Sequence, residues 1–235
     1  FFSMKREDYF STSYSLQIKN LVRLIVKMKL YTSRILNNAL LILESSDKPI
    51  DAKLVAKITE CEFKLKNESL ALEDAVNRII ALRQPVAFDL RFLLSSIKIS
   101  AELNYAASWA KKTIRSLQKI DGGLEEVGKQ DLTSMLEIAF TTLKDTISIL
   151  LQFDSKKKAD SEILFKIDQM LKRDDQVDNI YEKILQDGLN AIKAKNADPI
   201  VVFETIGIAK SLEKVSDCIH NMIITTRYVL TGKRL

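Results

Sequence analysis

Apolar residues recur every three or four positions through most of this 235-residue chain, which is the spacing of one face of an α-helix. The segments with this period span residues 12–46, 50–82, 85–118, 130–153, 159–194 and 198–231. Only six Gly and three Pro interrupt the chain. The prolines stand near the heads of three segments, where the missing N–H of the first helical turn costs nothing; they are Pro49, Pro85 and Pro199. The pattern therefore predicts long helices and almost no sheet.

The second half of the pattern repeats the first. Asp121, Gly122 and Gly123 form the strongest break, with three helical segments on either side. The segments that begin at Pro85 and Pro199 match one another, so that Ser108 aligns with Asp217. We predict an all-α fold of two tandem three-helix bundles, six long antiparallel helices in all, produced by an internal repeat. The expected divisions are an N-terminal extension 1–13, a first repeat 14–120, a linker 121–129 and a second repeat 130–235.

Composition narrows the class of protein. The 46% hydrophobic content is enough for a sizeable core, and the net charge of +5 comes from 36 basic and 31 acidic residues scattered along the chain. No basic stripe with interleaved aromatics indicates nucleic-acid binding. Cys61 and Cys218 do not suggest a disulfide scaffold, so we expect a reducing, cytoplasmic compartment. No apolar run approaches a membrane span, and no signal-peptide pattern is present.

Two pairs of acidic residues, one on each of the last two predicted helices, are spaced four residues apart. Each pair therefore shares one helix face, and packing of the two helices would bring four carboxylates together. Such like charges repel one another unless a cation lies among them, and oxygen ligands suit hard cations, iron or manganese. The candidate metal ligands are Asp174, Asp178, Glu213 and Asp217, with His220 and Asn221 as additional candidates on the same face. The sequence thus points to one site in the second repeat for a divalent or ferric ion: iron, zinc, manganese or magnesium.

The alternative interpretation is a solvated acidic face whose charges are paired with lysines. Lys210 and Lys214 stand at suitable spacing from Glu213 and Asp217. In contrast, no lysine stands three or four residues from Asp174 or Asp178. Both interpretations remain open at this point. The matching positions of the first repeat carry one anion and one cation and predict a degenerate site there; they are Glu62, Lys66, Asn104 and Ser108.

No catalytic constellation stands out. His220 is the only histidine, so the chain cannot supply the two Glu-x-x-His motifs of a carboxylate-bridged di-iron oxidase. No nucleophile elbow and no glycine-rich phosphate loop occur. We therefore expect a protein that is not an enzyme.

The chain resembles the PhoU family at three places, and the resemblance extends from about residue 14 onward. The most specific is the junction of the second and third helices, with Arg83, Gln84, Pro85, Ala87, Asp89, Leu90 and Arg91. The others are Ser211 to Asp217 on the sixth helix and, on the fifth, Asp174, Gln176, Val177, Asp178 and Tyr181. The resemblance implies a cytoplasmic, often dimeric, all-α protein that binds metal through Glu or Asp-x-x-x-Asp pairs. It also implies a link between an ABC-type phosphate importer and a sensor histidine kinase, restraining phosphate uptake and phosphate-starvation signalling.

The leading hypothesis is accordingly a non-enzymatic, metal-binding adaptor in phosphate homeostasis, expected as a homodimer that reaches the membrane only through its partners. One alternative is a metal-storing or metal-dependent carboxylate enzyme centred on the four acidic residues. Another is the soluble part of a phosphate cotransporter, which would require a membrane portion encoded upstream of Phe1.

Overall fold

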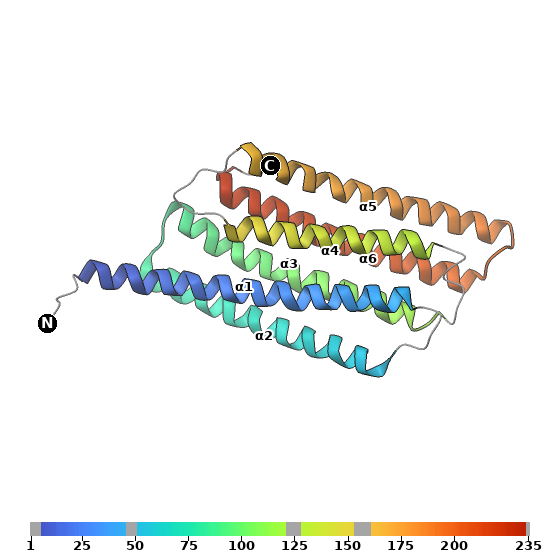
Figure 1. Ribbon diagram of the computed structural model, residues 1–235, viewed down its shortest axis with the longest axis horizontal. Coiled ribbons are helices and arrows are strands. Elements are labelled where there is room, and N and C mark those ends of the chain that lie inside the picture. Colours follow the sequence, from blue (N-terminus) through green and yellow to red (C-terminus); the bar gives the residue numbers. More distant parts are fainter. Residues whose placement is uncertain (1–5, 46–50, 121–127, 153–160, 234–235) are drawn as a thin grey trace.

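The computed structural model describes residues 6–45, 51–120, 128–152 and 161–233, and the part of the chain that it describes contains six helices and no strand. Successive helices run in opposite directions along the long axis of the molecule (Figure 1). They are α1 (Arg6–Glu44), α2 (Ala52–Arg83), α3 (Ala87–Leu117), α4 (Lys129–Gln152), α5 (Ser161–Lys193) and α6 (Pro199–Thr231). The all-α prediction is confirmed. The largest difference from the predicted bounds is that α1 begins at Arg6, inside the expected N-terminal extension.

The packing of the helices follows the repeat. α1, α2 and α3 contact one another, and α4, α5 and α6 do the same. α3 and α6 make the most extensive helix–helix contact in the molecule, and α1 also packs on α4. The two helical groups are therefore joined along their length, with α3 and α6 at the centre of the assembly.

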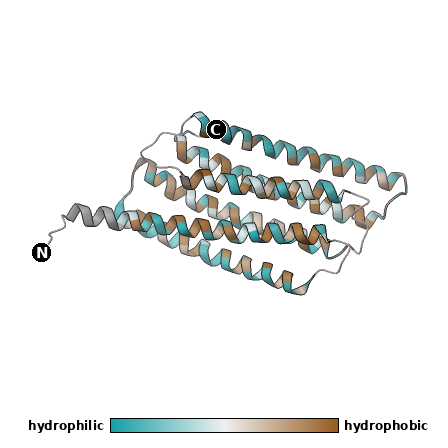
Figure 2. Cartoon of the chain, viewed as in Figure 1, coloured by the Kyte–Doolittle hydropathy of each residue, from teal (hydrophilic) through white to brown (hydrophobic). Residues whose placement is uncertain are grey.

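One hydrophobic core runs through both helical groups. Its fully or almost fully buried members come from every helix and include Leu36, Leu72, Ile99, Leu143, Val177 and Ile219. Hydrophobic and hydrophilic residues mix along each helix rather than gathering at one end (Figure 2), as expected for helices that each bury one face. Burying one such aliphatic side chain contributes about 1.5–3 kcal/mol, so this shared core holds the two groups together.

The predicted helix starts at the prolines have different outcomes. Pro199 is the first residue of α6, and Asp198 caps the helix by accepting a hydrogen bond from the Ile200 N–H at 2.8 Å. Pro85, in contrast, lies before α3 and not in its first turn. Gln84 precedes it at φ 46° and ends α2 in the left-handed conformation, with its N–H donating to the Ile80 carbonyl at 3.1 Å.

Two sequence predictions fall on undescribed parts of the chain. Pro49 and the break at Asp121, Gly122 and Gly123 lie outside the described residues. No helix in the described ranges is both long and apolar enough to cross a membrane.

Candidate functional site

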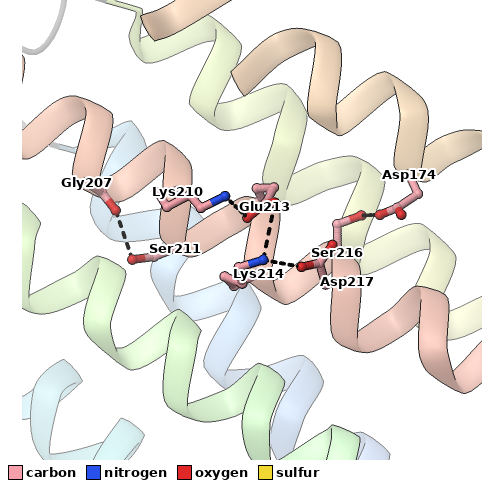
Figure 3. Close-up of polar contacts among 8 residues, drawn as sticks. All are labelled: Asp174, Gly207, Lys210, Ser211, Glu213, Lys214, Ser216 and Asp217. Atoms are coloured by element: carbon pink, nitrogen blue, oxygen red, sulfur yellow. Dashed lines mark hydrogen bonds and ion pairs between the residues drawn. The ribbon is translucent and has the colours of Figure 1, made fainter. Parts of the chain in front are cut away.

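The predicted acidic residues lie where α5 packs against α6. Asp174 of α5 accepts a hydrogen bond at its Oδ1 from the Ser216 hydroxyl of α6, at 2.7 Å (Figure 3). Its other oxygen, Oδ2, lies 3.0 Å from Nδ1 of His220, one turn further along α6. Both oxygens of Asp174 therefore face α6, and His220 joins the site as the sequence spacing suggested.

Two carboxylates of α5, Asp174 and Asp178, are not paired with a lysine or arginine among the described residues. Burial is the main cause that raises the pKa of Asp174 above its ordinary value, and neighbouring carboxylates add to it, while Ser216 and His220 oppose the shift. Burial also raises the pKa of Asp178, and here the charges of Asp174, Glu213 and Asp217 add in the same direction. The surroundings of these two aspartates therefore favour a proton or another cation.

The carboxylates of α6 are instead paired with lysines from their own helix. Glu213, which is only 9% exposed, has Oε2 3.0 Å from Nζ of Lys210 and Oε1 3.4 Å from Nζ of Lys214. The Lys214 ammonium also donates to Asp217 Oδ2 at 2.5 Å (Figure 3). Lys210 additionally lies 4.9 Å from the centre of the Tyr181 ring on α5. Two ammonium groups thus neutralise the α6 half of the site.

The negative charge of these acidic residues suits a cation, but the positions of their side chains do not. Within the described residues, no group of three or more His, Cys, Asp or Glu side chains is placed to hold a metal ion. The Lys214 ammonium bridges Glu213 and Asp217, while Asp178 and Asn221 are exposed. A metal ion coordinated by the predicted set would therefore have to displace Lys214, whose side chain is 36% exposed and has room to move into solvent.

The matching positions of the first repeat form a different arrangement. Burial would raise the pKa of Glu62, but hydrogen bonds from Lys111 and Lys66 outweigh it and lower that pKa. Lys66 lies 3.2 Å from Glu62, and Lys111 reaches it from α3. Asn104 donates to the Ser100 carbonyl of its own helix at 2.9 Å, and Ser108 is exposed. Glu62 is therefore paired twice by lysines, with no second carboxylate at these positions.

Two residues of the site are absent from the sequence-based candidates. Glu102 of α3 interacts with Cys218, Asn221 and Asp217 of α6; burial raises the pKa of its carboxyl, and hydrogen bonds from Cys218 and Asn221 oppose the shift. The pKa of the Cys218 thiol is raised to about 12 by burial and by Glu102. Glu102 brings a residue of the first repeat to the acidic face of the second. The only sequence signal for Glu102 is that it lies in the segment of α3 that aligns with α6.

Comparison with known proteins places the chain in a family. The family model described as the PhoU domain matches residues 25–122 and 132–225, one stretch in each half. The chain is 26% identical over 165 residues to a phosphate-specific transport system accessory protein PhoU homolog of Clostridium acetobutylicum, covering 70% of this chain and 71% of that protein. A homolog of the same name from Rhizobium meliloti is 24% identical, with coverage of 94% and 88%.

Solved structures show the same fold. PhoU from Pseudomonas aeruginosa matches with a TM-score of 0.79 at 19% identity, covering 94% of this chain and 100% of that chain. The phosphate transport system regulatory protein PhoU from Streptococcus pneumoniae matches with a TM-score of 0.79 at 18% identity, covering 94% and 99%. Because two matches to the family model together span most of the sequence, one on each group of three helices, this chain belongs to the PhoU family.

Proposed function

We propose that this chain regulates phosphate uptake and phosphate-starvation signalling as a non-enzymatic, cytoplasmic adaptor between an ABC-type phosphate importer and a sensor histidine kinase. The observation that carries the proposal is the pair of PhoU-domain matches, one in each half of the chain. The names of the relatives support it, because they are called phosphate-specific transport system accessory proteins.

Long helical faces with exposed apolar side chains are a second support. Phe63 and Leu70 lie seven residues apart on α2, on one helix face, and are 65% and 62% exposed. Large apolar side chains exposed together are typical of surfaces that bind other proteins. We infer that such faces mediate contact with partners and with a second copy in a homodimer.

Deletion of the gene tests the regulatory role. We expect phosphate uptake and phosphate-starvation genes to stay active in the deletion strain at high phosphate, and the wild-type gene to restore repression. Unchanged phosphate responses would count heavily against the proposal.

Co-purification tests the adaptor role. We expect the importer ATPase or the kinase to be recovered with the tagged protein from cells grown at high phosphate. Cells grown at low phosphate provide the matched comparison. Recovery of neither partner under either condition would leave a regulator that does not act as an adaptor.

We further propose that the acidic face of α5 and α6 binds a hard divalent or ferric ion when Lys214 moves away. The supporting observation is the raised pKa of Asp178, which is caused first by burial and further by the charges of the neighbouring carboxylates. The ligands would be Asp174, Asp178, Glu213 and Asp217, with His220 and Asn221 as further candidates; the ion would screen their mutual repulsion and fix α5 against α6.

Metal analysis of the purified protein tests this site. A Lys214→Gln variant should bind the ion more tightly than the parent protein, because the competing ammonium is gone, whereas Lys66→Gln in the first repeat should not change binding. An Asp178→Ala, Asp217→Ala double variant should lose the ion. If neither the parent protein nor Lys214→Gln binds iron, zinc, manganese or magnesium, the metal site does not exist.

A further inference from the structure

A groove lies between the start of α3 and the end of α6. These helix ends are at the end of the molecule opposite the α5–α6 turn (Figure 1). Its volume is about 530 Å³, which lies within the usual range of ligand-binding pockets. One wall is a face of α3 with Leu90, Leu94 and Ile97, and the other is formed by Tyr228 and Gly232 near the end of α6. The groove is thus an apolar channel between two helices and is separate from the carboxylates of α5.

Two cations, Arg91 and Lys98, lie along this groove. Neither makes an ion pair with any carboxylate among the described residues, and the buried Nε of Arg91 has no hydrogen-bond partner there. Several other basic residues in the described ranges are paired, such as Lys27 with Glu68 at 2.9 Å and Lys183 with Asp131 at 2.8 Å. Because a buried donor without a partner is unfavourable, the groove favours an anionic group that would supply one.

Local structure holds the Arg91 side chain in the groove. Its guanidinium carbon lies 5.9 Å from the centre of the Phe88 ring. Gly232, at φ 71°, allows a close approach of the backbone, because a Cβ there would lie 3.3 Å from the same carbon. These two contacts restrict the guanidinium, and any such restriction lowers the entropic cost of binding.

Backbone strain at the groove is a further, independent observation. Ala87, which lines it, has φ 48°, a left-handed conformation that is unfavourable for a residue with a Cβ. Strained residues persist where the surrounding structure holds them and are concentrated at functional surfaces. Here the strained residue is the first residue of α3 and part of the groove lining.

We propose that this groove docks an acidic amphipathic helix of a partner protein. Arg91 and Lys98 are seven residues apart on α3, about 10 Å along its axis, so two carboxylates seven residues apart on a docked helix would reach both. Apolar side chains between those carboxylates would cover Leu94, which is 47% exposed. An arginine fork pairs well with a carboxylate, and amphipathic helices commonly bind in apolar grooves. This inference rests on the proposed function, because the groove would give the adaptor a surface for a partner. Peptide binding is measured without reference to phosphate signalling, so failure of one proposal is distinguishable from failure of the other.

A labelled synthetic peptide tests the proposal with the full chain. The probe is a fluorescent helical peptide of about 18 residues that carries two Glu seven positions apart with Leu between them, and binding is followed by fluorescence anisotropy. We expect saturable binding that weakens about threefold to tenfold in Lys98→Glu, and similarly when both Glu of the peptide become Gln. Lys112→Glu is the matched control, because Lys112 is exposed on the same helix but outside the groove and lies over the Trp109 ring.

Circular dichroism first establishes that both variants fold as the parent protein does. Absence of saturable binding, equal affinity for the Gln peptide, or equal weakening by Lys112→Glu would each overturn the proposal. Vesicles containing phosphatidylglycerol are tested alongside. If they bind in a Lys98-dependent way while the peptide does not, the groove faces a membrane and the docking proposal is wrong.

Discussion

Individual carboxylates of this protein are shifted in opposite directions, and the shifts make stability depend on pH. The raised pKa of Asp174 means that the folded chain holds this proton more tightly than the unfolded chain does. Its contribution to the free energy of unfolding is therefore largest below its unfolded pKa of about 4 and falls as pH rises through the folded pKa. The lowered pKa of Glu62 acts the other way, stabilising above the unfolded pKa and losing that effect as pH falls.

We predict that Asp174→Asn lessens the loss of stability between pH 4 and pH 7, because Asn removes the buried charge and still accepts a hydrogen bond from Ser216. Glu62→Gln should have the opposite effect, costing about 1 kcal/mol or more at pH 7 and less near pH 4. Urea unfolding of both variants across this range measures the difference. Parallel pH profiles for the two variants would contradict the assignment.

The spacing of residues predicted those interactions of the site that lie within one helix. Lys210 stands three residues from Glu213, and Lys214 stands three residues from Asp217. Both pairs form in the structure, as expected for an acidic face whose charges are paired with lysines. Lys111 and Glu102 could not be found in this way, because both reach their partners from α3. Contacts between helices depend on how the helices dock, which the period of a single helix does not contain.

At the scale of whole elements, two glycines in the helices of the second repeat should respond differently to the same substitution. A Cβ at Gly188 of α5 would lie 2.8 Å from Val202 Cγ1 of α6, whereas a Cβ at Gly207 would meet nothing within 4 Å. We expect Gly188→Ala to destabilise the protein by about 1–3 kcal/mol through overpacking. Gly207→Ala should stabilise it by up to about 1 kcal/mol, because alanine favours the helix. Thermal and urea unfolding distinguish the two, and equal effects would mean that α5 and α6 are not packed at Gly188.

The junction of α2 and α3 supplies a second contrast. Ala87→Gly should stabilise the protein by about 0.5–1 kcal/mol, since glycine adopts the positive φ of 48° without strain. The same change at Ala101, exposed in the middle of α3, should destabilise it by about 1 kcal/mol. A destabilising effect of both substitutions in urea would show that the left-handed conformation is absent in solution.

The helical period predicted six helices, and the proline rule placed the start of α6 correctly. The rule misplaced Pro85, which lies in the link between α2 and α3, between the left-handed residues Gln84 and Ala87. Left-handed residues that are not glycine carry no reliable sequence signal, so this geometry could be found only in the structure.

At the scale of the molecule, the repeat predicted two bundles but not how far they depend on each other. An apolar stripe on a helix shows that one face is buried, but not which helix covers it. In the structure, the most extensive helix contact joins α3 of one group to α6 of the other, and the buried core is continuous across them. Separating the groups would expose this interface to water, which is unfavourable in proportion to the apolar area exposed.

We therefore predict that the halves 1–120 and 121–235 do not fold stably when expressed alone, although each contains three helices and a PhoU-domain match. Each separate half should lack a cooperative urea transition and bind hydrophobic dyes, whereas co-expressed halves should associate and recover one transition. The intact chain, studied by circular dichroism and by the fluorescence of Trp109 in the first half, should give coincident curves, because one shared core unfolds as a unit. A separate half that unfolds cooperatively at the denaturant concentration of the intact chain would show that the α3–α6 contact joins two independent domains.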